Sequence, residues 1–419
     1  MFVNPLSSKM LRQTTSLFGS GLFITLLSAI TVPIVTRSLG PINYSTYILY
    51  TNITNFILLF VHLGFFVTVG IMLAETTSID EQRSLIGATL CISFTIGICY
   101  ALLILLVSFA TDAVFNVTIG RIMRLTIPFL VCYPFYLVYT QIGKGTNRID
   151  SIVYAKSLPI ILRACVIVLL WSIGMLTVTS MIFIEASIAI IPLLVLITVF
   201  KPSLMNLPAN LKRIWIRNKE FGIHVYISMI FSQSTYELDG VMIPIFAAPE
   251  ALGFYRLANV FAATMNDFSV ALGTSQFTKY THSKGISGKS LVFNYIVLAL
   301  GALGTMLLGS RIIRFVAGEG FNIPFGLILP IAFLGFINGA FQPYNHFLNA
   351  KGKGKWMRNI GYIVSGVNIV GNLTLIPFFG AIGAAWASFL SKGTGYITNP
   401  HYYRRLTHNQ CMAEYMKKN

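Results

Sequence analysis

Residues 84–109 read SLIGATLCISFTIGICYALLILLVSF and contain no charged side chain. A run of about 20 apolar residues can cross the hydrocarbon core of a bilayer as an α-helix. Over all 419 residues, 55% are hydrophobic and only 10% are charged. A soluble chain of this length would carry about a quarter charged residues. Composition therefore places the chain among membrane proteins.

Apolar runs of this kind recur along the whole sequence. The first is too long for a signal-peptide core and no small-residue cleavage site follows it, so we expect it to be a retained span. The pattern predicts an all-α polytopic membrane protein with about 12 transmembrane helices. The predicted spans lie near 14–36, 44–70, 84–109, 121–143, 152–174, 176–200, 221–247, 252–275, 289–317, 323–349, 356–378 and 381–400.

The distribution of basic residues predicts the orientation. With the N-terminus inside, 22 of the 30 Lys and Arg fall in cytoplasmic segments, 5 fall outside and 3 lie within spans. Cytoplasmic loops are enriched in Lys and Arg, so we expect both termini to be cytoplasmic. The same reading predicts a six-helix lobe over 1–200, a basic cytoplasmic linker over 201–220, a second six-helix lobe over 221–400 and a basic cytoplasmic tail over 401–419.

The sequence contains a weak internal repeat. RSLGPINYSTY (37–47) is similar to EALGFYRLANV (250–260), and QIGKGTNRID (141–150) is similar to NAKGKGKWMRN (349–359). The two offsets are 213 and 209 residues, about half the chain. Parallel repeats of six helices around a central cavity are a recurring transporter architecture. The alternative is a chance recurrence of Gly and Lys in loops.

Charged side chains within apolar runs are the candidate functional residues. Such residues are costly in a bilayer and usually face a partner or a water-filled cavity. The basic candidates for substrate binding are Arg37, Arg163, Arg256 and Lys392, and the acidic candidates for ion coupling are Asp239, Glu237, Asp267 and Glu185. Anchoring at the membrane interface is the alternative for Arg37, and snorkelling is the alternative for Arg256.

The segment FSQSTYELDGVMIPIF (231–246) holds two of these acids. Residues two apart on a helix point about 200° apart, so Glu237 and Asp239 cannot share a face. Asp239 continues a polar stripe, which predicts that it faces a cavity, whereas Glu237 is expected to pair with a neighbouring helix. The other members of the stripe are Ser228, Ser232 and Thr235.

Two further patterns concern pairs of charges. Arg163 and Glu185 lie at matching depths in consecutive antiparallel spans, which favours an interhelical ion pair. Arg256 and Asp267 are 11 residues apart, about 16 Å of helix, so they cannot pair directly. They are instead expected on one wall of a cavity, in a stripe with Asn259 and Thr274.

Other chemistries have little support in the sequence. The six His are scattered without metal-ligand spacing. No Walker loop and no serine elbow is present, and no cofactor is expected. The net charge of +17 lies in short clusters between apolar runs, which argues against nucleic-acid binding.

Several stretches together resemble a known superfamily. They are TVPIVTRSLGP (31–41), YELDGVMIPIFAAPEALGFYRLANVF (236–261), LNAKGKGKW (348–356) and NLTLIPFFGAIGAAWAS (372–388). They resemble the multidrug/oligosaccharidyl-lipid/polysaccharide exporter superfamily. Within it, the chain is most similar to the Wzx-type O-antigen flippases.

The resemblance implies a function and partners. It implies transfer of undecaprenyl-pyrophosphate-linked O-antigen or polysaccharide repeat units from the cytoplasmic to the periplasmic leaflet of the bacterial inner membrane. It also implies alternating access coupled to a proton or sodium ion, basic cavity residues that meet the pyrophosphate, and contact with membrane lipids and other polysaccharide-assembly proteins. Arg37 is the base of the Arg-Ser-Leu-Gly motif, and Asp239 is the acid of the seventh-helix motif.

Two other functions remain open at this point. A multidrug/cation antiporter of the same superfamily would favour an acidic cavity, and four acids in the predicted spans are compatible with it. A membrane enzyme of polysaccharide assembly, such as a polymerase or acyltransferase, is the second alternative. Polymerases of this kind tend to carry a large periplasmic loop, whereas the predicted outside loops here are short.

Overall fold

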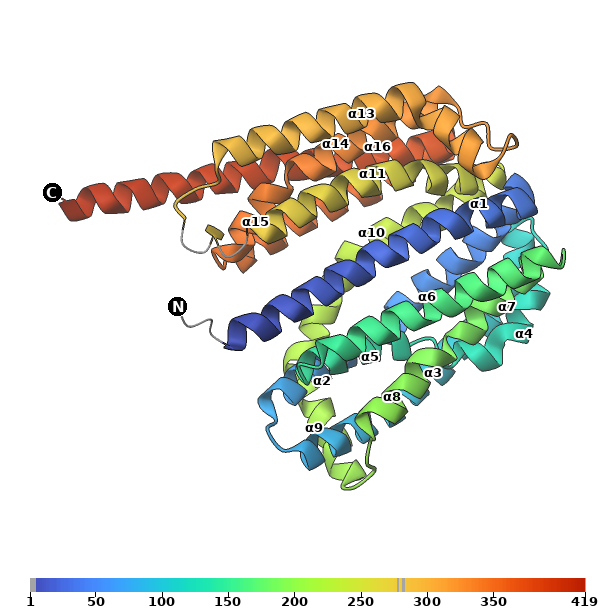
Figure 1. Cartoon of the computed structure of the whole chain (residues 1–419), viewed down its shortest axis with the longest axis horizontal. Coiled ribbons are helices and arrows are strands. Elements are labelled where there is room, and N and C mark those ends of the chain that lie inside the picture. Colours follow the sequence, from blue (N-terminus) through green and yellow to red (C-terminus); the bar gives the residue numbers. More distant parts are fainter. Residues whose placement is uncertain (1–4, 277–278, 281–282, 419) are drawn as a thin grey trace. The chain divides into compact units, whose positions relative to one another are not determined.

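The computed structural model describes residues 5–276, 279–280 and 283–418. Within these residues the regular elements are helices and no β-strand is present, which confirms the all-α fold class (Figure 1). The chain divides into two compact units, Met1–Ile230 and Phe231–Asn419.

The N-terminal unit is built from helices joined by short breaks and turns. Its core contains large buried side chains, among them Tyr50, Tyr100 and Phe135. Its elements are α1 (Pro5–Val61), α2 (Phe65–Glu75), α3 (Ile79–Phe115), α4 (Gly120–Leu130), α5 (Phe135–Gly145), α6 (Ile149–Ser172), α7 (Val178–Ile188), α8 (Ile190–Phe200), α9 (Leu207–Arg217), the π-helix η1 (Asn218–Gly222) and the start of α10 (Ile223–Phe246).

The C-terminal unit packs around α14, which contacts α11, α13 and α16. Met265, Leu298, Ala302, Ala332 and Ala340 form one buried apolar cluster among these helices. The elements of the unit are the remainder of α10, α11 (Glu250–Ser275), α13 (Gly288–Ala317), α14 (Phe325–Ala340), α15 (Gln342–Ala350) and α16 (Gly354–Lys418).

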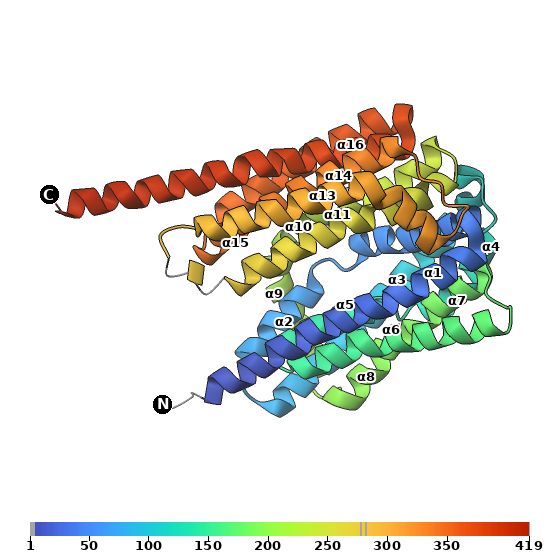
Figure 2. The ribbon, with the colours of Figure 1, turned by 45° about the horizontal axis from the view of Figure 1, so that its top comes forward.

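Two helices reverse direction at a glycine. Gly40 in α1 has φ 72° and Gly380 in α16 has φ 54°, in the region that only glycine adopts without strain. The ribbon of α16 folds back on itself (Figure 2). Its two limbs run antiparallel, because Trp356 stacks on Tyr402 and the Ser391 hydroxyl donates to the Val364 carbonyl at 2.8 Å. These limbs match the predicted spans 356–378 and 381–400.

One other predicted span is sharply bent in the structure, and two more are interrupted only briefly, since each still counts as one helix long enough to cross a membrane. The span 44–70 bends by 60° between α1 and α2, where Leu63 and Gly64 both have positive φ. The span 121–143 divides into α4 and α5 just before Pro134, and 176–200 divides into α7 and α8 at Ala189. Proline lacks a backbone N–H, which explains the break at Pro134.

Length and composition give a smaller number of spans than the sequence pattern. Seven helices among the described residues are long and apolar enough to cross a membrane, or eight if the bent α1–α2 pair is one span. The helix α11 is not among them, because it carries several polar side chains along its length. Twelve crossings and cytoplasmic termini therefore remain predictions.

The outer faces of the long helices suit contact with lipid. Leu102, Leu106 and Phe109 are exposed on one face of α3, and Leu300 and Leu307 are exposed on one face of α13. Exposed large apolar side chains at helical spacing are expected where a helix meets hydrocarbon rather than water.

The predicted linker 201–220 is structured. Its helix α9 lies against α2 and α3, where Arg217 pairs with Glu75 at 3.1 Å and Arg213 pairs with Glu81. The Asn210 amide donates to the Ser84 hydroxyl at 2.9 Å. The segment is therefore an ordered part of the N-terminal unit. The predicted lobe boundaries themselves remain a prediction.

Candidate functional site

Four of the eight charged candidates surround one cavity in the C-terminal unit. The cavity has a volume of about 220 Å³. Asp239 comes from α10, Arg256 and Asp267 from α11, and Lys392 from the second limb of α16. Most of the other lining residues are polar, including Asn259, Asn266, Asn338, Asn368, Ser388 and Ser391.

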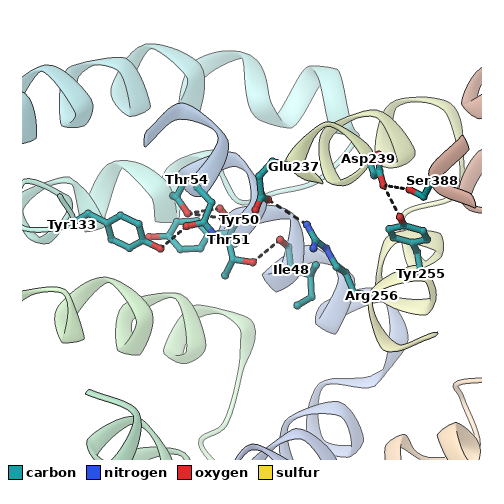
Figure 3. Close-up of polar contacts among 11 residues, drawn as sticks. Ile48, Tyr50, Thr51, Thr54, Tyr133, Glu237, Asp239, Tyr255, Arg256 and Ser388 are labelled. Carbon is teal, nitrogen blue, oxygen red and sulfur yellow. Dashed lines mark hydrogen bonds and ion pairs between the residues drawn. The ribbon is translucent and has the colours of Figure 1, made fainter. Parts of the chain in front are cut away.

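Asp239 is the most enclosed of the four, with 4% of its surface exposed. Its Oδ2 accepts the Tyr255 hydroxyl at 2.5 Å and the Ser388 hydroxyl at 3.2 Å (Figure 3). Its Oδ1 accepts the Asn372 amide at 2.6 Å. Hydrogen bonds to an ionised carboxylate are stronger than neutral ones, so three donors stabilise the buried charge. They also fix the carboxylate in the cavity wall.

Asn372 extends this network by one residue. Its Nδ2 also donates to Asn368 Oδ1 at 3.1 Å, one helical turn away. The Asn372 Oδ1 is buried, and among the described residues it has no hydrogen-bond partner. An acceptor left without a donor next to a carboxylate is costly, unless a cation or a donor group completes the site.

Arg256 lines the same cavity and pairs with Glu237. The Arg256 Nη2 lies 3.4 Å from Glu237 Oε2, and both side chains are about one quarter exposed (Figure 3). The expected pairing of Glu237 with a neighbouring helix is confirmed, because Arg256 belongs to α11. The pair places the guanidinium in the cavity wall rather than extended away from it.

The predicted stripe on α11 is only partly in the cavity. Asn259 and Asp267 line it with Arg256, while Thr274 is not among the lining residues. Asp267 is exposed. The side chains of Ser228, Ser232 and Thr235, which were expected to continue the stripe of Asp239, lie outside the described side chains.

The N-terminal unit contains a second cavity, of about 340 Å³. Its charged lining residues are Lys156 and Arg163 from α6 and Glu185 from α7. The rest of the lining is mainly apolar or aromatic and includes Leu58, Tyr133, Leu137, Pro159 and Ile160. A cavity of this kind suits a ligand with an apolar body and an anionic group.

The expected pair of Arg163 and Glu185 is confirmed, with 3.4 Å between Arg163 Nη1 and Glu185 Oε2. The Tyr47 hydroxyl from α1 bridges them: it accepts from Arg163 Nη2 at 2.6 Å and donates to Glu185 Oε2 at 2.9 Å. Three helices are thereby joined through one polar cluster. Arg37 is exposed on α1 and does not line this cavity, so the structure does not bring it together with Arg163.

Several residues of the two cavities were missed from the sequence. Ser388 was missed although it lies one helical turn from the predicted Lys392. Asn368 and Asn372, also one turn apart, were missed too, so polar residues at helical spacing were the available signal. Lys156 was counted among the cytoplasmic bases near a span end. Tyr47 and Tyr255 carry no such signal, because tyrosines are common in apolar spans.

Residues 10–277 match the protein family described as polysaccharide biosynthesis protein. The chain belongs to the polysaccharide biosynthesis protein family. The match covers more than half of the sequence and extends from the first helix through α11. A search of curated proteins finds no match.

Solved structures similar to this member of the family are transporters. One is the lipid II flippase MurJ in an inward closed conformation, with a TM-score of 0.66 and 14% identity, over 94% of this chain and 90% of that one. Another is an inward-facing multidrug resistance MATE family transporter of the MOP superfamily, with a TM-score of 0.64 and 12% identity, over 92% of this chain and 96% of that one. A eukaryotic MATE transporter has a TM-score of 0.52 and 12% identity, over 95% of this chain and 98% of that one. Identities this low show the fold alone, and the chain has the fold of these transporters.

Proposed function

We propose that the chain is a flippase for lipid-linked oligosaccharide. It moves undecaprenyl-pyrophosphate-linked O-antigen or polysaccharide repeat units from the cytoplasmic to the periplasmic leaflet. The proposal places it in the bacterial inner membrane, in lipopolysaccharide or related polysaccharide biosynthesis. Its partners would be the membrane lipids and other polysaccharide-assembly proteins.

The observation that carries the proposal is a charged cavity inside each unit of a polysaccharide biosynthesis protein. Sugars and pyrophosphate cannot enter hydrocarbon without a large loss of hydration. A polyprenyl tail, in contrast, is apolar and can stay in the hydrocarbon core of the bilayer. A transporter for this substrate therefore needs polar cavities within otherwise apolar helices.

The bases in the two cavities suit a pyrophosphate. Arg163 and Arg256 are each oriented by a carboxylate, Glu185 and Glu237. A guanidinium has five N–H donors, so one carboxylate partner does not exhaust it. Lys156 and Lys392 add ammonium groups to the same cavities. We include Arg37 as a base that would meet substrate outside the two cavities.

The acids in the C-terminal cavity suit a coupling ion. Asp239 and the adjacent Asn372 Oδ1 supply oxygen ligands on α10 and α16, which a sodium ion or a proton could share. Asp267 lines the same cavity. In this proposal Glu237 and Glu185 hold arginines, so their part in coupling is indirect.

The test is leaflet transfer in liposomes that contain the purified full-length protein. The probe is a labelled polyprenyl-pyrophosphate glycan, with and without a proton or sodium gradient. We expect transfer by the wild type and a loss of at least tenfold in Asp239→Asn and Arg256→Ala. Asp80→Asn is the matched control, because its side chain is 93% exposed and pairs only loosely with Arg83 at 3.7 Å.

Other outcomes would assign another function. Efflux of a cationic dye under an ion gradient, with no glycan transfer, would identify a multidrug/cation antiporter. A change in glycan length or acylation would identify an enzyme of polysaccharide assembly. Equal transfer by Asp239→Asn and the wild type would leave the flippase but remove Asp239 from coupling.

A further inference from the structure

One end of the C-terminal unit combines aromatic and basic side chains that neither cavity uses. The Trp356 ring stacks on Tyr402 with 5.1 Å between centroids, so both limbs of α16 meet there. Tyr403 packs edge-on against Phe347 at 5.1 Å. Lys353 Nζ lies 5.4 Å and Arg405 Cζ 6.0 Å from the centroid of Trp356.

The position of this cluster along α16 indicates its depth in a membrane. Trp356 and Tyr402 lie 24 and 22 residues from the reversal at Gly380. At 1.5 Å per residue these limbs span about 33–36 Å. The hydrocarbon core of a bilayer is about 30 Å thick. The cluster is therefore one bilayer thickness from the reversal, at the interface where Trp and Tyr concentrate.

Beyond this ring cluster, one face of the second limb is cationic. His401, Arg404, Arg405 and His408 are all exposed and line an open pocket of about 490 Å³. Residues 401, 404 and 408 follow helical spacing, so they share a face. The same face continues back through Ile397, which is 70% exposed, and Leu390, which is 50% exposed. It thus passes from apolar to cationic along one helix.

The sequence provides few counter-charges near this face. From Phe321 to Ala413 it contains no Asp and no Glu, and the first acid beyond is Glu414, six residues after His408. The arginines of α9 in the N-terminal unit differ, because Arg213 pairs with Glu81 and Arg217 with Glu75. An anion for the cationic face must therefore come from another part of the chain or from another molecule.

We propose that this face of α16 binds the phosphate headgroup of an anionic phospholipid. Arg404 and Arg405 offer paired N–H donors that match a phosphate, and the two imidazoles add further donors. Ile397 and Leu390 would lie along the acyl chains. The cationic part of the face would thus meet the headgroup phosphate, and its apolar part would meet the acyl chains. A phospholipid presents these two parts in the same order along the membrane normal.

The test is native mass spectrometry of the full-length, delipidated protein with added phosphatidylglycerol or phosphatidylcholine. We expect R404Q/R405Q to bind phosphatidylglycerol about tenfold more weakly or worse, since each base near an anionic lipid surface contributes measurably to affinity. Binding of phosphatidylcholine should not change. R404K/R405K should retain most of the affinity, which separates charge from folding.

The matched control is R311Q/R314Q, which removes two exposed arginines from α13. It should bind both lipids as the wild type does. Unchanged phosphatidylglycerol binding by R404Q/R405Q, or an equal loss in the control, would overturn the proposal. So would a loss confined to a polyprenyl pyrophosphate probe, because the face would then belong to the transported lipid. None of these outcomes depends on whether transport is observed.

Discussion

The hydroxyl of Tyr255 lies 2.5 Å from Oδ2 of Asp239, and Asp239 is almost completely buried. In the N-terminal unit Tyr47 makes a comparable bond to Glu185 at 2.9 Å. In each unit, therefore, a tyrosine donates a hydrogen bond to one carboxylate, and the helix that carries the tyrosine also contains a Leu-Gly sequence. Removing a donor from a buried carboxylate is costly because the charge loses both a hydrogen bond and its compensation for lost hydration.

We expect Tyr255→Phe to lower the free energy of unfolding by about 1–3 kcal/mol. It should also reduce transport, because Asp239 would lose one of its three donors. Thermal unfolding in detergent and leaflet transfer in liposomes measure the two effects. Tyr154→Phe is the control, since Tyr154 is 69% exposed on α6. A Tyr255→Phe protein as stable and active as the control would show that this bond is dispensable.

We expect Arg163 and Glu185 to be energetically coupled. Their side chains are 36% and 22% exposed and Tyr47 bridges them, so the coupling should exceed that of a surface pair. A double-mutant cycle with Arg163→Gln and Glu185→Gln should give about 1–2 kcal/mol, discounted from the value for fully buried pairs because both groups reach solvent. The Arg83–Asp80 cycle should give less than about 1 kcal/mol. Simple additivity at Arg163 and Glu185 would contradict the prediction.

The sequence was a good guide where one physical rule decides the outcome. Apolar runs located the helices, including both limbs of α16. Matching depth predicted the contact of Arg163 with Glu185, because antiparallel neighbours place residues equally far from a shared turn side by side. Residues two apart on a helix point about 200° apart, which predicted that Glu237 and Asp239 lie on different faces. In the structure they have different partners, Arg256 and Tyr255.

The sequence was a poor guide where distant segments decide the outcome. The bend at Gly64 fits against the backbone of Gly222, which leaves no space for a side chain there. The Asn218 amide also donates to the Leu63 carbonyl at 3.1 Å. No local pattern around residue 64 encodes a contact made more than 150 residues later. The two Leu-Gly motifs also differ locally: Gly40 has φ 72° inside α1, whereas Gly253 is buried within α11.

We expect Lys156→Gln to weaken transport without changing stability. Lys156 lines the N-terminal cavity, so an ammonium that meets an anionic substrate should matter for transfer and not for folding. Transfer of the pyrophosphate-linked glycan should fall about tenfold, corresponding to about 1.4 kcal/mol. The free energy of unfolding should differ from that of the wild type by no more than about 0.5 kcal/mol. Lys212→Gln on the exposed side of α9 is the control. Equal transfer by the two variants would remove Lys156 from the substrate path.

We expect Gly380→Ala to destabilise the C-terminal unit. At Gly380 φ is 54° and ψ is −131°, and an added Cβ would lie 2.9 Å from the Ala247 Cβ. A non-glycine residue in such a conformation costs about 1–3 kcal/mol. Gly366→Ala is the control within the same helix, because its backbone is helical and an added Cβ meets open space. That change should stabilise the protein by about 0.5–1 kcal/mol, since alanine loses less entropy in a helix. Chemical unfolding of both variants measures the difference. If both substitutions shifted stability in the same direction, the reversal of α16 at Gly380 would not depend on its positive φ.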